Sequence, residues 1–271
     1  MKAIEISRDE WESSLSDFTY SLFITPQWVS AMENENSTAV YINFVKRNNI
    51  IAKIAGVVMR GKNLKGNQLY FYAGPALRGA NQTTYDECFE ALKRFAQYNN
   101  MKRVIVGSYD QQHSLLPEVK GFFHTKRYEY IVDFTSSQEI HFSTGFRKNV
   151  KRAERVGTTF HCDRSISTLE KMLTLLGVTH DLREVKYGKE YNPFYMPNLN
   201  AYALQKLLES KMGIMYYTIT EGHIHSVQFN IESEGKVYGL LMGSDSFAYQ
   251  NGLPSFVDYN LITTYAEKKF K

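Results

Sequence analysis

The sequence has few cysteines and no long hydrophobic run. Its 271 residues include two cysteines, Cys88 and Cys162, which lack the paired spacing of zinc sites and redox motifs. We therefore expect two reduced thiols and no metal site. A run of roughly 18 uncharged apolar residues, the length that spans a membrane, occurs nowhere, and the N-terminus shows no signal-peptide pattern. These absences predict a cytoplasmic protein without a transmembrane segment.

The overall composition excludes several further classes. A formal net charge of +4 suits an anionic ligand, but it is too small for a dedicated nucleic-acid-binding module. The hydrophobic fraction of 43% and the charged fraction of 22% are ordinary for globular proteins and exclude disorder. Because 271 residues are long for one domain, two similar halves are expected.

The first half shows an ordered series of elements. Alternating apolar residues and turn residues predict two strands joined as a hairpin, a third strand that Gly74 and Pro75 end, a helix, and a further apolar strand. These elements are expected at residues 39–46, 50–59, 68–73, 84–98 and 103–108.

The last third repeats this order. Three strands are expected at residues 213–220, 223–231 and 236–242, followed by a loop and a helix that begins near Pro254. The distance from the glycine that ends the third strand to the helix start is the same in both copies, from position 74 to 84 and from 243 to 253. Equal spacing in two places indicates a duplicated unit.

The region between the copies completes the predicted domains. A strand is expected at residues 129–134, a helix between the cap Ser143 and Gly157, and further helices at 167–183 and 198–211. Helices covering sheet faces predict a layered α/β or α+β fold. We place the domains at residues 1–135 and 136–271. The last helix of the second copy is followed by no strand, so its final strand is expected to be absent and its sheet edge open.

Three short motifs resemble the FemAB family. They are LYFYAGP at residues 69–75, GFRKNVKRAERVG at 145–157, and ITPQWV at 24–29, where that family has a short aromatic helix. The resemblance spans roughly residues 20–271. It implies two acetyltransferase-like (GNAT) domains in tandem, each with a mixed central sheet flanked by helices.

The resemblance also implies a reaction. Such proteins transfer an acyl or aminoacyl group to an amine of a cell-wall or surface-polysaccharide precursor, which is an anionic small molecule or a UDP-linked or lipid-linked acceptor. The co-substrate is aminoacyl-tRNA or acyl-CoA, and no cofactor is permanently bound. The sequence lacks both the coiled-coil arm of some relatives and the usual CoA loop pattern. A non-catalytic RNA-binding or scaffold module is therefore the alternative.

Candidate catalytic residues follow the third strand of the second copy. Amine acylation needs an uncharged amine, an oxyanion cradle and a route for a proton, and the sequence shows no Ser-His-Asp set. We expect Asp245 to orient or deprotonate the amine and Tyr249 to protonate the leaving group; the alternative is that Asp245 and Ser246 only form a turn. His223 and His225 lack a third metal ligand and are interpreted as a surface or cleft-wall pair.

Candidate donor-binding residues lie in the same segment, residues 244–255. We assign Ser244, Gly252 and Ser255 to the donor, since Gly252 permits close backbone approach to a pyrophosphate. Pro254 removes one N–H donor, and the segment has no Arg or Lys. Tight CoA binding is thus disfavoured, and both donors stay open.

Candidate acceptor and phosphate contacts lie on a strand and a helix. Gln228 and Asn230, at alternate positions of one strand, point to the same face and are expected to hydrogen-bond an acceptor, unless that face is simply exposed. Five cations fall within residues 147–155 on one helix, which suits phosphate contact; a solvated face balanced by Glu154 and distant acids is the equally open alternative. They are Arg147, Lys148, Lys151, Arg152 and Arg155.

Overall fold

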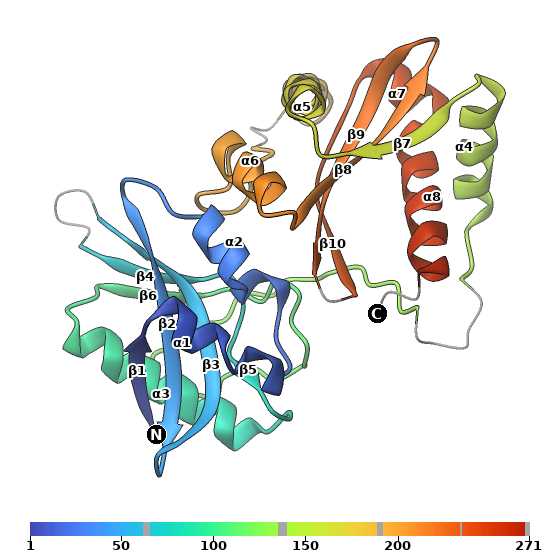
Figure 1. Ribbon diagram of the computed structural model, residues 1–271. Coiled ribbons are helices and arrows are strands. Elements are labelled where there is room, and N and C mark those ends of the chain that lie inside the picture. Colours follow the sequence, from blue (N-terminus) through green and yellow to red (C-terminus); the bar gives the residue numbers. More distant parts are fainter. Residues whose placement is uncertain (62–65, 135–139, 189–191, 234, 269–271) are drawn as a thin grey trace. The chain divides into compact units, whose positions relative to one another are not determined.

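The chain folds into two compact units, Met1–Glu129 and Tyr130–Lys271. The structure, a computed structural model, describes all residues except 62–65, 135–139, 189–191, 234 and 269–271. Each unit has one β-sheet flanked by helices (Figure 1). The predicted mixed α/β fold is therefore confirmed. The predicted boundary, after residue 135, lies a few residues further along the chain than the division between the units.

The first unit contains the elements expected in the first copy and several shorter ones. Its sheet has the order β1-β2-β3-β4-β6, with β5 paired to β3; β4 and β6 run parallel and the other neighbours antiparallel. The elements are β1 Lys2–Ile6, α1 Arg8–Glu12, η1 Leu15–Asp17, η2 Leu22–Ile24, α2 Pro26–Ala31, β2 Ser37–Lys46, β3 Asn49–Met59, β4 Gln68–Phe71, β5 Ala76–Leu77, α3 Gln82–Tyr98 and β6 Arg103–Val106.

The second unit has an antiparallel sheet in the order β10-β9-β8-β7. Figure 1 shows α5 and α6 on one side of this sheet and α8, backed by α4, on the other. The elements are α4 Thr144–Arg155, β7 Thr159–Asp163, α5 Ile166–Tyr187, α6 Ala201–Glu209, β8 Gly213–Thr220, β9 His223–Ser233, β10 Lys236–Ser244, α7 Ser246–Asn251 and α8 Leu253–Glu267.

The two units repeat one arrangement. In each, an antiparallel strand (β1 or β7) lies beside a meander of three strands, and a long helix (α3 or α8) follows the third strand of that meander. In the first unit β6 then lies parallel to β4. Among the described residues, no strand occupies the corresponding place beside β10, which pairs with β9 alone.

The first sheet packs against α3 through an apolar interface. Asn81 caps this helix through the N–H of Thr84, and the helix buries one apolar face against the strands. Each buried large side chain contributes about 1.5–3 kcal/mol. The fully buried members of this core include Ile42, Phe44, Ile54, Leu69, Phe71, Cys88 and Leu92.

Two details of the sequence interpretation are wrong. Residues 129–134 do not form a strand. Tyr130 and Ile131 are exposed, because strand-forming residues adopt a strand only where a sheet offers them a neighbour. The helix expected from residue 198 instead begins after Asn200, whose side chain accepts the N–H of Ala203.

Candidate functional site

The candidate site lies in the second unit, where β10 ends. In the first unit the corresponding place is closed by backbone pairing beyond the strand ends: Gly107 N–H donates to Phe71 O at 2.7 Å and Tyr109 N–H to Tyr72 O at 3.2 Å. In the second unit the chain turns directly from β10 into α7. The predicted site residues between positions 244 and 255 therefore lie at the end of β10, on α7 and at the start of α8.

The donor loop expected at residues 244–255 is wrong, because most of it is helical. Asp245 caps α7, and Gly252, with φ of 73°, ends α7 and precedes α8. Asp at a cap position satisfies a free N–H of the first turn, which explains why this short helix forms. Only glycine adopts the left-handed conformation at the junction without strain.

Asp245 and His225 form a hydrogen-bonded pair. Asp245 Oδ1 accepts the N–H of Ala248 at 2.9 Å, and Asp245 Oδ2 lies 2.8 Å from His225 Nδ1. The two side chains are 26% and 18% exposed. The ring of His225 also stacks on Phe247 with centroids 4.3 Å apart. The carboxylate and the ring therefore fix each other in position.

This pair has the arrangement of a general base. In the tautomer that carries its proton on Nδ1, the ring donates Nδ1–H to the carboxylate and the Nε2 lone pair is available to take a proton. No contact within the described residues engages Nε2 of His225. The sequence interpretation missed this role of His225. No local sequence signal reveals it, because the contact depends on the β9–β10 register, which pairs Ser244 with Ser226 and so places Asp245 beside His225.

The other predicted catalytic residue, Tyr249, lies apart from this pair. Its side chain is 45% exposed on α7. The contact that joins it to Asp245 is a backbone hydrogen bond of 3.2 Å. Within the described residues the structure shows no contact between the phenol and the side chain of Asp245 or His225, so its role in protonating a leaving group stays a prediction.

Ser244 is anchored rather than open to a ligand. Its side chain is fully buried and its Oγ lies 2.7 Å from Ser226 Oγ. Its N–H donates to Thr179 Oγ1 at 2.9 Å, and the same hydroxyl donates to Ser244 O at 2.9 Å. The N–H and C=O of Ser244, which a neighbouring strand would otherwise pair with, are thus both bonded to Thr179 of α5. In this conformation Ser244 has no free backbone group for the acyl-donor substrate.

Gly252 and Ser255 contact α4. A Cβ on Gly252 would lie 2.7 Å from Asn149 O, and Asn149 Nδ2 donates to Ser255 Oγ at 3.2 Å. The close backbone approach that we expected for a pyrophosphate is therefore made by α4. With Asp245 at the start of α7 and α4 over the start of α8, the N-termini of both helices in this segment are occupied.

Gln228 and Asn230 do share a face, but that face is covered by α8. Asn230 is 2% exposed and its Nδ2 donates to Tyr265 OH at 3.1 Å. Gln228 Nε2 donates to Asn230 Oδ1 at 3.0 Å, while Gln228 Oε1 is buried with no hydrogen-bond partner among the described residues. Tyr265 in turn donates to Glu232. These groups form a polar network between sheet and helix rather than an acceptor surface.

Asp258 on α8 is a further polar group that the sequence interpretation missed. Burial raises the pKa of its carboxyl to about 6, and no hydrogen bond or ion pair of this side chain is found within the described residues. Asp258 is partly buried, and a partly buried carboxyl without a partner costs stability; such groups are concentrated at functional sites.

The predicted phosphate-binding cations lie on α4 and are exposed. Two of them hold backbone carbonyls: Arg147 Nε donates to Phe142 O at 3.0 Å, and Arg152 Nη1 donates to Gln250 O of α7 at 2.9 Å. Lys148, Lys151 and Arg155 form no ion pair within the described part of the chain, so the expected alternative, balance by Glu154, is not realised through an ion pair.

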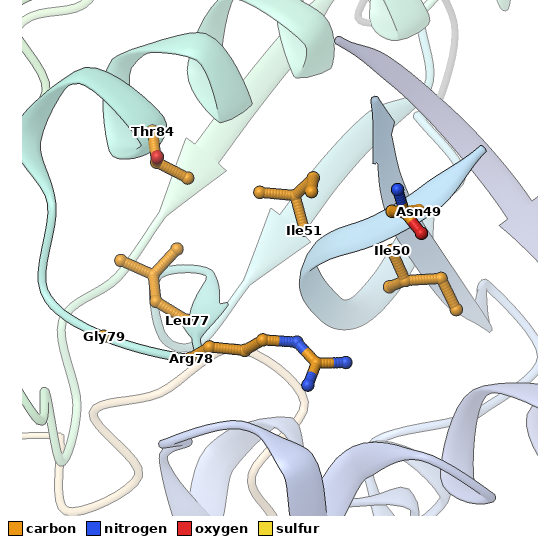
Figure 2. Close-up of a pocket in the computed structure, with 7 residues that line it drawn as sticks. All are labelled: Asn49, Ile50, Ile51, Leu77, Arg78, Gly79 and Thr84. Atoms are coloured by element: carbon orange, nitrogen blue, oxygen red, sulfur yellow. The ribbon is translucent and has the colours of Figure 1, made fainter. Parts of the chain in front are cut away.

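A shallow pocket of about 450 Å³ lies in the first unit, between the β2–β3 turn and the start of α3 (Figure 2). Its one charged side chain, Arg78, bonds Asp17 at 3.2 Å and lies over the ring of Phe18. The predicted site residues do not line it. Its lining residues are Asn49, Ile50, Ile51, Leu77, Arg78, Gly79 and Thr84.

Among the described residues, no group of three His, Cys, Asp or Glu side chains could hold a metal ion. Nor does any helix in that part of the chain combine the length and apolarity needed to cross a membrane.

Solved structures show the same fold over nearly the whole chain. The structure of FemX matches with a TM-score of 0.62 at 12% identity, covering 99% of this chain and 86% of that one. The two chains share one fold. L-PGS from Bacillus licheniformis matches with a TM-score of 0.55 at 15% identity, covering 98% of this chain and 74% of that one.

A third match is a C-terminal domain from Agrobacterium fabrum, described as that of a lysylphosphatidylglycerol synthetase. Its TM-score is 0.52 at 13% identity, and 97% of this chain and 77% of that one are covered. No protein-family model and no curated protein matches the sequence. The FemAB resemblance is thus confirmed at the level of the fold, and identities this low show the fold alone.

Proposed function

We propose that this protein is an N-acyltransferase that moves an aminoacyl group from aminoacyl-tRNA to an amine of a cell-wall precursor. The observation that carries the proposal is the Asp245–His225 pair at the end of β10, in a chain that shares the fold of FemX over 99% of its length. The motifs at residues 69–75 and 145–157 support the same reaction class independently of the coordinates.

His225 acts as the general base in this proposal. The acceptor amine attacks the ester carbonyl of the donor, a C–N bond forms, and Nε2 of His225 takes the proton that the amine releases. The tetrahedral intermediate then expels the ribose oxygen of the tRNA, and the imidazolium returns the proton to that oxygen. Asp245 holds the ring and stabilises its charged form, since both of its own oxygens are engaged.

Aminoacyl-tRNA is favoured over acyl-CoA by the occupied helix ends. A CoA pyrophosphate would need free N–H groups at a helix N-terminus. The carboxylate of Asp245 takes that position on α7, and like charge repels phosphate. On α8, Pro254 has no N–H and Gly252 lies against Asn149. Aminoacyl-tRNA carries no pyrophosphate that must bind at these helix ends, so neither obstacle applies to it.

The acceptor is proposed to be a UDP-linked or lipid-linked precursor with a free amine. The FemAB resemblance supports the cell-wall class, and the fold shared with a protein described as a lysylphosphatidylglycerol synthetase makes a lipid acceptor the second choice.

A donor and acceptor screen tests this function. Purified protein is incubated with labelled aminoacyl-tRNA or acyl-CoA and with UDP-muropeptide, lipid-linked muropeptide or phosphatidylglycerol. The expected result is a labelled muropeptide when aminoacyl-tRNA is the donor, and no labelled product when acyl-CoA is the donor. Transfer from acyl-CoA would overturn the donor. Tight tRNA binding without transfer to any acceptor would instead favour the non-catalytic RNA-binding module.

A further inference from the structure

The most basic helix surface of the second unit is the outer face of α4. We define this face by Thr144, Arg147, Lys148, Lys151, Arg152 and Arg155, all exposed. The opposite face buries Val150 and Ala153 against Leu253 and Phe256 of α8. Figure 1 shows α4 as the outer layer on this side of the second unit. One helix therefore presents five cations to solvent and is fixed in place by its apolar side.

We propose that this outer face binds the phosphate backbone of the donor RNA, an inference that rests on the proposed function. Arg147, Lys151 and Arg155 follow one another at four-residue intervals, about 6 Å apart along the helix axis. That separation is comparable with the distance between successive phosphates of a nucleic-acid strand. Lys148 and Arg152 flank the row.

The charges on this face are available to a ligand. Like charges three and four residues apart destabilise a helix unless an anion compensates, and Lys148, Lys151 and Arg155 have no carboxylate partner in the described part of the chain. Release of counterions from a polyanion is the interaction that such a row favours. The face also lacks apolar side chains, so it has nothing to insert into a lipid surface, and RNA is the occupant that it fits.

The outer face is joined directly to the candidate site. Arg152 bonds the carbonyl of Gln250 at 2.9 Å, near the end of α7, and Asp245 caps the beginning of the same helix. α7 has six residues and is therefore about 9 Å long. A ligand bound along α4 by its phosphates would have a reactive end within reach of His225, which is the geometry that a large donor with a terminal ester requires.

The test measures binding of uncharged tRNA, which needs no turnover. Lys148, Lys151 and Arg155 are replaced together by Ala, and Arg147 and Arg152 are kept because they hold backbone carbonyls. The matched control replaces three exposed lysines of the first unit, Lys2, Lys102 and Lys120, so that the net charge changes equally. Fluorescence anisotropy at several salt concentrations gives affinity and salt slope, and circular dichroism checks the fold.

The triple α4 variant should bind at least tenfold more weakly than wild type, and its log Kd against log salt should lose about one unit of slope for each contact removed. The control variant should behave nearly as wild type. Equal loss of tRNA affinity in both variants would mean that only net charge matters, and would overturn the proposal that the outer face of α4 binds RNA. So would an α4 variant that keeps tRNA but loses anionic phosphatidylglycerol vesicles. Absence of transfer in the donor screen would refute the enzyme while leaving this binding result intact.

Discussion

The hydroxyl of Thr179 forms two hydrogen bonds with the backbone of Ser244, each 2.9 Å long, and so joins α5 to the last residue of β10. Thr179→Val keeps the shape but leaves a buried N–H and C=O unpaired, which should cost about 2 kcal/mol. Thr179→Ser, the matched control, retains the hydroxyl. Amide hydrogen exchange of β10 measures the difference, and equal protection in the two variants would contradict this account of the strand edge.

Gly252 should tolerate no side chain. Gly252→Ala combines a φ of 73° with a Cβ 2.7 Å from Asn149 O, so the strain and the clash together should cost about 3 kcal/mol. Gly222→Ala is the control, because that residue has a φ of 80° with nothing near its Cβ, and it should lose about 1 kcal/mol. Hydrogen exchange in α4 and α8 reports the result. Similar losses at both positions would show that Asn149 moves aside.

Asp258 should make the second unit less stable at neutral pH than at acidic pH. Burial raises the pKa of its carboxyl from 3.8 to about 6. Its ionisation therefore opposes folding increasingly as pH rises from about 4 to 6, and fully above that. Asp258→Asn should add up to about 3 kcal/mol at pH 7.5 and almost nothing at pH 4. The stabilities of the variant and the wild type are compared at both pH values by thermal unfolding, monitored by circular dichroism. A gain that does not depend on pH would contradict the buried charge.

Lys53, in the first unit, should give the opposite dependence of stability on pH. The side chain is fully buried, and burial lowers the pKa of its ammonium group to about 8, against the attraction of Glu10 and Asp17. The charged form opposes folding below pH 8, and this penalty disappears as pH rises towards 10.5. Lys53→Met should therefore be more stable than wild type at pH 7 by about 2 kcal/mol, after loss of the bond to Trp11 O.

The measurement for Lys53 uses tryptophan fluorescence in urea, since both tryptophans, Trp11 and Trp28, lie in the first unit. The advantage of the variant should shrink between pH 8 and pH 10.5. A constant advantage over that range would mean that folding does not shift the pKa of this amine.

Local patterns in the sequence were sufficient for the repeated elements. The strands β2, β3, β8, β9 and β10 and the helices α3 and α4 follow from alternation, helical spacing and caps such as Ser143. The short segment after Ser244 was misread as a loop because Gly243 and Gly252 bracket it and Asp245 and Ser246 are typical turn residues, although Asp245 is also a valid helix cap.

Contacts between distant segments decided what the sequence could not. Alternation placed Gln228 and Asn230 on one face, but whether α8 covers that face depends on how a helix far along the chain packs. The pairing of His225 with Asp245 depends on the β9–β10 register, which contains a bulge between Gly239 and Leu241. Neither relationship has a local signature.

Single-turnover transfer from aminoacyl-tRNA to muropeptide by His225 variants tests the central claim most directly. His225→Ala should slow transfer at least 100-fold by removing the base, whereas His223→Ala, on the same strand with its ring 6.3 Å away, should retain the wild-type rate. Added imidazole should restore part of the lost rate, which a merely structural role for His225 would not allow. A His225→Ala protein that transfers at the wild-type rate would contradict the account.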